Sequence, residues 1–337
     1  MSELGLHQLF DKYIPNTNNS EIDFAQVLCM MVMNIINASN PLYRVEEWFE
    51  DYLDGLTEGS VLANKYNDDR LGRALDRLFA ADRGSLMTEL SSQAIAVHAL
   101  ILDVIHNDTT SITFAGEYKT PSSDAVVPKI GFNKDHRPGC KQVVFGLNIT
   151  EDGHVPISYQ LYNGNQADVT THVPNWNGLR KLIGEDDFIY VADSKLCTLE
   201  TLSHIAEHGG KFITLIPRNF KEATGFLNRV AAGEEIEWHC CYKKASSRTK
   251  GKSDIYLIHE GEQFRDGYRM LWVHSSSKDS KEKSARERRL NIAEEKLNAI
   301  SQKLNIYALK SREQIEKKIK NILTGCGELI AGELIEH

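Results

Sequence analysis

Two aspartates occupy positions where a carboxylate can do chemistry. Asp108 lies inside a strand-like run at residues 106–111, which is rich in Thr and Ser. Asp193 directly follows the short apolar run at residues 188–192 and precedes a predicted helix that begins near Thr198. In open α/β sheets, ligands bind beyond the carboxyl ends of the strands. This placement makes both aspartates candidate ligand-binding residues.

Two carboxylates on adjacent strands can hold a divalent metal. Mg²⁺ prefers oxygen ligands and keeps several waters, so one or two carboxylates and a substrate phosphate are enough to bind it. A pair of such ions about 3.5–4 Å apart clamps the attacking and leaving oxygens of a phosphodiester displacement. Taken without further context, the same aspartates could equally be turn or cap residues.

The segments around the aspartates are typical of a mixed α/β sheet. Val, Ile and Thr dominate residues 102–114, as expected for a strand. Three strand-like runs come first and are followed by helix, strand, helix and strand, which predicts a mixed sheet that begins with an antiparallel meander. The later strands are predicted at residues 142–150, 155–162, 188–192 and 212–216, and the helices at about 173–184 and from Thr198 to Gly209-Gly210.

Residues 1–100 are predicted to be helical. The apolar run at 24–36 is shorter than the ~20 residues of a membrane span, so we expect a buried helix. Asn67 or Asp68 should cap a second helix, with Asp69 and Arg73 as a local ion pair. Its apolar stripe comprises Leu71, Ala74, Leu75, Leu78 and Phe79.

The last third of the chain changes character twice. Residues 218–277 are polar, with strand-like pieces at 235–242, 254–259 and 270–274, and we interpret them as an insertion. From residue 278 to 323 the pattern is helical. The residues Leu290, Ala293, Leu297, Ile300 and Leu304 form a heptad-like stripe that could pack on the body or pair with a second helix.

Composition and charge narrow the class of protein. The chain has no apolar N-terminal signal segment and no C-x-x-C pair, so we expect a cytoplasmic protein whose six cysteines are reduced and structural. The net charge of −8 is uneven: residues 1–100 carry −8, whereas residues 278–320 carry +6. Such asymmetry is compatible with local DNA contacts, and also with solvated loops and helix faces.

The local motifs together resemble those of DDE-type transposases of bacterial insertion sequences, in the group with a Tyr-Arg-Glu-Lys signature. The matching stretches in the catalytic part are residues 104–111, residues 131–138 with Lys141-Gln142, Gly164-Asn165 with Asp168, and residues 191–194. Those in the helical part are residues 41–43 and 67–76. The resemblance covers nearly the whole chain.

The resemblance implies a ribonuclease-H-like core, in which the first Asp lies on the first strand and the second Asp follows the fourth. Asp108 and Asp193 would then be the catalytic residues and bind Mg²⁺ or Mn²⁺. Implied partners are DNA (transposon ends and target) and further copies of the chain on DNA, with no membrane association. The expected fold class is α+β, with a helical domain at 1–100, the core at 101–217, the insertion at 218–277 and a helical segment at 278–337.

Two departures from the family pattern affect this interpretation. Gly139-Cys140 stands where the family often has Asp-Leu, which should alter only a loop. The third acid, a Glu in a Tyr-x2-Arg-x3-Glu-x6-Lys pattern, is not completed by Tyr268 or Tyr307. We therefore expect a C-terminally truncated core that does not cleave DNA efficiently alone. The nearest substitutes for the third acid are Glu287 and Glu294, both expected on a solvated helix face.

Candidate DNA-binding residues come from two sources. The resemblance points to Lys134, His136, Arg137 and Lys141, which could instead form a structural loop. Charge points to Lys243, Lys244, Arg248, Lys250 and Lys252, together with Arg286, Arg288 and Arg289. Asn165 and Asp168 are expected to be a turn and a helix cap, and His106 a packed neighbour of Asp108.

The sequence therefore predicts a truncated form of a transposase, from a family that the resemblance implies cuts and joins DNA with a divalent metal. Two alternatives stay open at this stage. The chain could be a non-catalytic DNA-binding or multimerising regulator of transposition, or an inactive remnant of a disrupted element.

Overall fold

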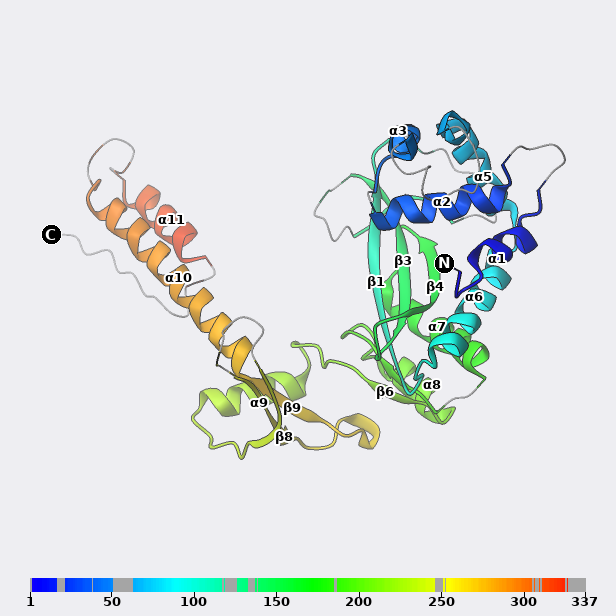
Figure 1. The fold of residues 1–337 in the computed structure, drawn as a ribbon. Helices are drawn as coiled ribbons and strands as arrows, with labels where there is room; N and C mark the ends of the chain where they lie inside the picture. The colour runs from blue at the N-terminus through cyan, green and yellow to red at the C-terminus, as the bar shows by residue number, and fades with distance from the viewer. Residues whose placement is uncertain are drawn as a thin grey trace. The chain divides into compact units, whose positions relative to one another are not determined.

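The computed structural model divides into two compact units, Met1–Arg218 and Asn219–His337, which are described separately (Figure 1). Among the described residues, no helix combines the length and the apolarity needed to span a bilayer. The structure describes residues 2–16, 22–37, 39–50, 63–116, 118, 126–132, 137, 139–184, 187–245, 251, 253–304, 306, 309, 311–324 and 326.

The first unit begins with a helical bundle. Its helices are α1 (Leu6–Tyr13), α2 (Phe24–Asn37), α3 (Val45–Glu50), α5 (Asp68–Ala80) and α6 (Arg83–His98), with 3-10 turns η1 (Leu42–Arg44) and η2 (Ala63–Tyr66). The expectation of a buried helix at 24–36 is confirmed for most of α2, although Ile35 and Ile36 at its end are exposed. The bundle core gathers Phe10, Ile14, Leu28, Val45, Phe49, Tyr66 and Leu71.

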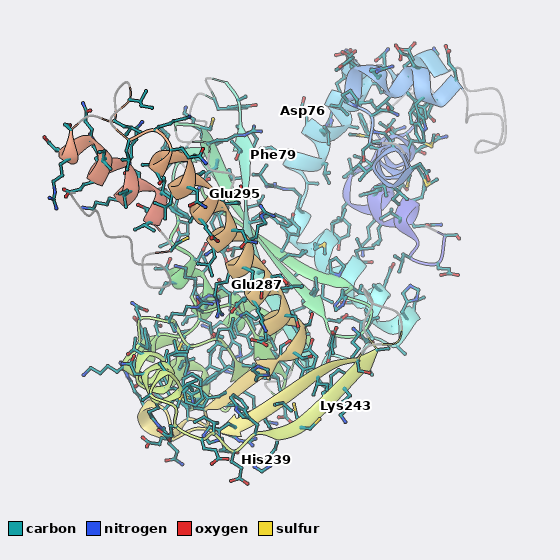
Figure 2. All side chains as sticks on the ribbon, turned by 90° about the vertical axis from the view of Figure 1, so that its left-hand side faces the viewer. Asp76, Phe79, His239, Lys243, Glu287 and Glu295 are labelled. Atoms are coloured by element: carbon teal, nitrogen blue, oxygen red, sulfur yellow. The ribbon has the colours of Figure 1, made fainter. Side chains whose placement is uncertain are left out.

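Helix α5 begins as predicted but buries less of its stripe. Asn67 caps it, because its side chain accepts a hydrogen bond from the Arg70 amide at 3.0 Å. The predicted Asp69–Arg73 ion pair is present. Leu71 and Ala74 are buried, whereas Phe79 is 64% exposed (Figure 2). The apolar stripe is therefore buried only in part, and at its end the Arg83 guanidinium lies 4.7 Å from the Phe79 ring centroid.

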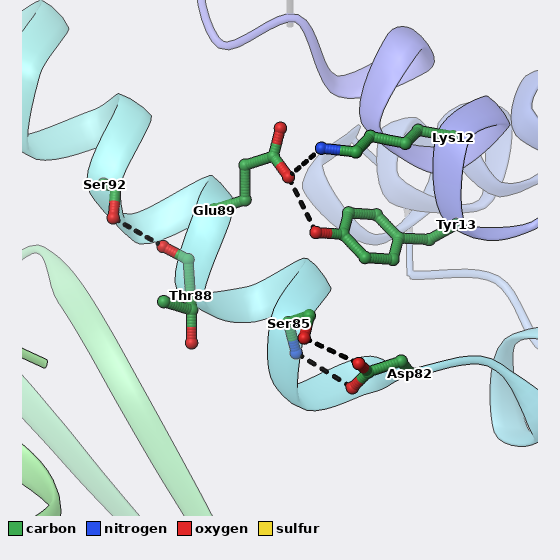
Figure 3. Close-up of polar contacts among 7 residues, drawn as sticks. All are labelled: Lys12, Tyr13, Asp82, Ser85, Thr88, Glu89 and Ser92. Atoms are coloured by element: carbon green, nitrogen blue, oxygen red, sulfur yellow. Dashed lines mark hydrogen bonds and ion pairs between the residues drawn. The ribbon is translucent and has the colours of Figure 1, made fainter.

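Polar contacts fix α6 against α1 (Figure 3). The Glu89 carboxylate accepts hydrogen bonds from Lys12 Nζ at 2.6 Å and from the Tyr13 hydroxyl at 2.7 Å. These two bonds hold the pKa of Glu89 below its usual range. Asp82 caps α6 by accepting from the backbone amide and hydroxyl of Ser85, at 3.0 and 2.6 Å.

A mixed sheet follows the bundle, as the sequence predicts. Its strands are β1 (Val104–Phe114), β2 (Lys129–Ile130), β3 (Lys141–Thr150), β4 (Pro156–Asn163), β5 (Ile189–Val191) and β6 (Lys211–Ile213). β1, β3 and β4 form an antiparallel meander, β5 and β6 run parallel to β1, and the order is β2-β3-β1-β5-β6 with β4 also on β3. Helices α7 (His172–Ile183) and α8 (Leu199–Glu207) connect the later strands.

The second unit holds a small sheet and a helical hairpin. Helix α9 (Lys221–Ala231) covers the antiparallel strands β7 (His239–Ala245), β8 (Ser253–Glu260) and β9 (Leu271–Ser275), since Phe226 stacks on Trp272 with centroids 4.0 Å apart. Helix α10 (Ser276–Ser301) packs against α11 (Arg312–Leu323). Ala293 and Ile315 are buried there, so the heptad-like stripe pairs with a second helix.

The cysteine expectation needs a correction. All six cysteines are free thiols, and Cys29, Cys197 and Cys326 are buried. Cys240 and Cys241 on β7 are exposed, so a structural role in a core does not describe them. Burial raises the pKa of Cys29 to about 11, which keeps that thiol protonated and unreactive.

Candidate metal centre and nucleic-acid interface

The pairing of β1 with β5 brings the positions of the two aspartates into line. The parallel register joins Val104 to Ile189, Ile105 to Tyr190 and His106 to Val191. Asp108 stands two residues beyond His106, and Asp193 stands two residues beyond Val191. Because side chains alternate along a strand, continuing this register places both aspartates on one face, opposite the fully buried Ile105 and Tyr190.

Both carboxylates are exposed and held by neighbouring backbone amides. Asp108 accepts a hydrogen bond from the Thr109 amide at 2.7 Å, and Asp193 accepts one from the Lys195 amide at 2.9 Å. The Asp193 carbonyl also accepts from the Thr214 hydroxyl at 2.7 Å. Carboxylate oxygens are the ligands that Mg²⁺ and Mn²⁺ prefer, so this pair suits such an ion. Within the described part of the chain, no group of three or more His, Cys, Asp or Glu side chains could hold a metal.

A buried polar network lies on the opposite face, next to these strands. Asn107 Nδ2 donates to Asn148 Oδ1 at 2.9 Å, and the amides of Asn148 and Asn175 exchange two hydrogen bonds of 2.8 Å. Asn175 Nδ2 also donates to the Tyr190 hydroxyl at 2.9 Å, which lies 3.2 Å from His172 Nδ1. The network thus connects β1, β3 and β5 through α7.

This network fixes the geometry under the candidate site. Asn107 precedes Asp108 directly, and Tyr190 stands three residues before Asp193. Any shift of the strands would break these buried hydrogen bonds, so the network favours one arrangement, although His172 Nε2 has no hydrogen-bond partner among the described residues. Asn148 and Asn175 were not identified from the sequence. The sequence signal that could have identified them is that each asparagine stands between apolar residues, Asn148 on β3 and Asn175 on α7.

The structure places Asp168 differently from the expected helix cap. It opens the 3-10 turn η3 (Asp168–Thr171), where no side chain caps the turn. Its carboxylate instead accepts from the Thr109 hydroxyl at 3.1 Å. Asn165 lies in a turn, as predicted. Asp168 therefore ties the start of α7 to the strand that carries Asp108.

Burial lowers the pKa of His172, and the charges of Asp193 and Asp168 oppose this only in part. The folded protein therefore holds His172 neutral at a pH where the unfolded chain, with a pKa near 6.5, already binds a proton. We expect stability to be complete above about pH 6.5 and to fall as the pH drops toward the lowered pKa. Each unit of lowering corresponds to about 1.4 kcal/mol.

Urea denaturation at pH 7.5, 6.5 and 5.5 measures this loss. His172→Gln should flatten the decline in unfolding free energy between pH 6.5 and 5.5. His98→Gln, which replaces an exposed histidine, is the matched control and should leave the decline unchanged. Equal pH profiles for all three proteins would contradict the prediction.

The predicted DNA-binding residues fall in several places. Lys243 (Figure 2) and Lys244 are exposed on β7, where they pair with Ile255 and Asp254 respectively. As successive residues of a strand they point to opposite faces of the small sheet. Arg137 is exposed, and Lys141 Nζ donates to the Tyr118 carbonyl at 2.6 Å. Lys134, His136, Arg248, Lys250 and Lys252 lie outside the described residues.

Comparisons with known proteins match one part of the chain by sequence. Residues 1–92 match the family model described as "Domain of unknown function (DUF4277)". No curated protein matches the chain.

Solved structures that resemble the chain include transposases. One is the cryo-EM structure of the piggyBac transposase synaptic complex with hairpin DNA, at a TM-score of 0.42 and 10% identity, covering 80% of this chain. The chain spans 60% of that protein's length. A second is the Mos1 transposase paired-end complex with left transposon end, at a TM-score of 0.24 and 10% identity, covering 65% of this chain and 75% of that chain. A third is the Mos1 mariner paired-end complex with Mn, at a TM-score of 0.25 and 14% identity, covering 68% of this chain and 83% of that chain. All three TM-scores lie below 0.5.

Proposed function

We propose that this chain is a DDE-type transposase of a bacterial insertion sequence, which cuts and joins DNA with a divalent metal. The observation that supports the proposal is the parallel register of β1 and β5, whose last pair, His106 with Val191, lies two residues before Asp108 and Asp193. The sequence resemblance requires the first Asp on the first strand and the second Asp after the fourth. If the two-residue strand β2 is left out of the count, β5 is the fourth strand. Asp108 then lies on the first strand, and Asp193 follows the fourth.

The residues present fit a divalent ion. Asp108 and Asp193 supply exposed carboxylate oxygens, and backbone amides orient both groups. An ion bound there would neutralise phosphate charge and activate the attacking oxygen in a phosphodiester displacement. The contribution of the chain itself is to position the carboxylates through the buried network and to hold the DNA backbone with its basic residues.

A second candidate function is a DNA-binding regulator of transposition that does not cut. It is favoured by one sequence observation, since no tyrosine in the printed sequence completes the Tyr-x2-Arg-x3-Glu-x6-Lys pattern. Both candidates bind DNA, and they differ in whether metal-dependent strand cleavage follows.

The test is metal-dependent nicking of end-labelled duplexes that carry the ends of the element encoding this chain. Cutting that requires Mg²⁺ or Mn²⁺ and is lost in Asp108→Asn and Asp193→Asn supports the transposase. The matched control is Asp103→Asn, which changes an exposed aspartate immediately before β1. Specific binding without cutting supports the regulator, and cutting that survives both site variants contradicts the proposed centre.

A further inference from the structure

The first half of α10 is exposed along its whole length. Every residue from Lys278 to Arg289 is exposed, and this stretch holds no large apolar side chain. A helix that is polar on all sides needs another source of stability, such as pairs of charges one turn apart. In the described structure, its one ion pair joins Lys278 Nζ to Glu282 Oε1 at 3.9 Å. Neither packing against other residues nor ion pairs within the helix explains why this stretch is so rich in charged residues.

The cations of α10 are concentrated on one side. With 3.6 residues per turn, successive residues are rotated by about 100° around the axis. On this basis five cations fall within a sector of about 100°, and we name them the basic stripe: Lys278, Lys281, Arg288, Arg289 and Lys296. Glu282 and Glu295 border the stripe, while Asp279, Glu287 and Glu294 lie on the other side. Figure 2 shows Glu287 and Glu295 along the helix.

Most of these cations have no protein partner. Lys281, Arg288, Arg289 and Lys296 make no ion pair or side-chain hydrogen bond with another described residue. Arg289 and Lys296 also border a hollow of 350 Å³ between α10 and the end of α11, whose other lining residues are Ile292, Ala293, Ile322, Thr324 and Cys326. That volume admits a phosphate group between two cations. Arginine forks in addition match the geometry of phosphate oxygens.

The length and the charge of the stripe fit duplex DNA. From Lys278 to Lys296, 18 residues further along, the helix rises about 27 Å along its axis. Double-stranded DNA carries one negative charge per ~1.7 Å of its axis, so a rigid row of cations meets phosphates along its full length. A protein partner would require an apolar centre in the contact. The stretch from Lys278 to Arg289 offers none, and within the rest of the stripe the exposed large apolar side chain is Ile292, which is 40% exposed.

We propose that the basic stripe of α10 binds the phosphate backbone of duplex DNA without regard to base sequence. The choice of DNA rests on the proposed function, but the assignment of the surface does not depend on the metal centre. Lys278, Lys281 and Lys296 extend the set of basic residues selected from the sequence, while Arg286 faces away from the stripe.

Two matched double variants of the full chain test the surface. Lys281→Gln/Arg288→Gln removes two cations of the stripe. Lys283→Gln/Arg286→Gln removes the same residue types from the same exposed helix, but from its other side. Binding to a fluorescein-labelled 30-base-pair duplex of arbitrary sequence is followed by anisotropy in EDTA at several salt concentrations. Circular dichroism checks that both variants keep their helix content.

The stripe variant should lose about tenfold or more in affinity at low salt, and its log–log salt slope should fall by about 2, since each phosphate contact contributes ~0.9. The control variant should change affinity by less than about threefold. Equal losses of affinity in both variants would mean that only the total charge of the helix matters, which would overturn the proposal. Unchanged binding in both variants would overturn it as well. A change in oligomeric state with DNA binding intact would assign the stripe to an acidic protein surface instead.

The same assay separates this proposal from the metal centre. Because EDTA removes divalent ions, the difference between the stripe variant and its control is measured without any contribution from the metal centre. If the nicking assay contradicts the metal centre, the binding result for α10 is unaffected. If the binding assay contradicts the basic stripe, the nicking result is unaffected.

Discussion

Asp108→Asn and Asp193→Asn should each lower the affinity of the chain for Mn²⁺ by about tenfold or more, and the double variant should lose little beyond the larger single effect. The reason is that both carboxylates are expected to hold one ion, and even residues behind metal ligands cost about 10–100-fold when changed. Once either carboxylate is removed, the other alone binds the ion only weakly, so the two losses of affinity are not additive. Isothermal titration with Mn²⁺, with and without duplex DNA, measures the three affinities.

The control again is Asp103→Asn, which removes the same charge close to the start of β1 and should leave the affinity unchanged. Losses that add fully in the double variant would mean two independent sites. Such a result would contradict the shared centre while leaving the strand register as it is.

The fold around the aspartates was largely predictable, because local signals and tertiary structure agree there. Asn67 and Thr198 cap the predicted helices through their side chains, and the β-branched run after residue 102 forms β1. The order of strands and helices predicted a mixed sheet, which the pairing pattern confirms. Each of these features depends on side chains within a few positions of one another.

The partners of the site could not be predicted, because they are distant in the sequence. Asn148 and Asn175 are 27 positions apart, and Asn107 is 41 positions from Asn148. A single sequence gives each asparagine a low preference for strands and helices and says nothing of the other amide that satisfies it. The two aspartates were recognisable, Asp108 inside a strand and Asp193 after one, but the network that holds those strands was not.

At two further places the structure differs from the arrangement that residue spacing suggests, and each difference has a physical cause. Phe79 has the right spacing for the buried stripe of α5, yet the bundle core does not reach the end of that helix. The run of lysines at 243 and 244 looks like one basic patch in the sequence. In an extended strand the two side chains point to opposite faces, whereas the 3.6-residue period of α10 gathers spaced cations on one side.

Gly164→Ala should destabilise the first unit by about 3 kcal/mol or more, whereas Gly178→Ala should stabilise it by about 0.5–1 kcal/mol. Gly164 follows β4 and is buried between two other strands. A Cβ atom there would lie 1.9 Å from the Gln142 carbonyl oxygen and 2.4 Å from the Lys129 carbonyl oxygen. Both are backbone atoms of paired strands, so neither can move aside without breaking β2 from β3.

The sequence marks Gly164 as part of a turn, but the reason for glycine there is lack of space. Gly178 supplies the control because it lies inside α7, where a Cβ atom would meet nothing within 4 Å and alanine favours the helix. Urea denaturation of both variants measures the two opposite shifts in unfolding free energy. If Gly164→Ala does not fold well enough for urea denaturation, its yield of soluble protein beside that of Gly178→Ala gives the same ordering. Similar stability of the two variants would show that β2 and β3 can separate at Gly164 at little cost, contrary to the close approach described here.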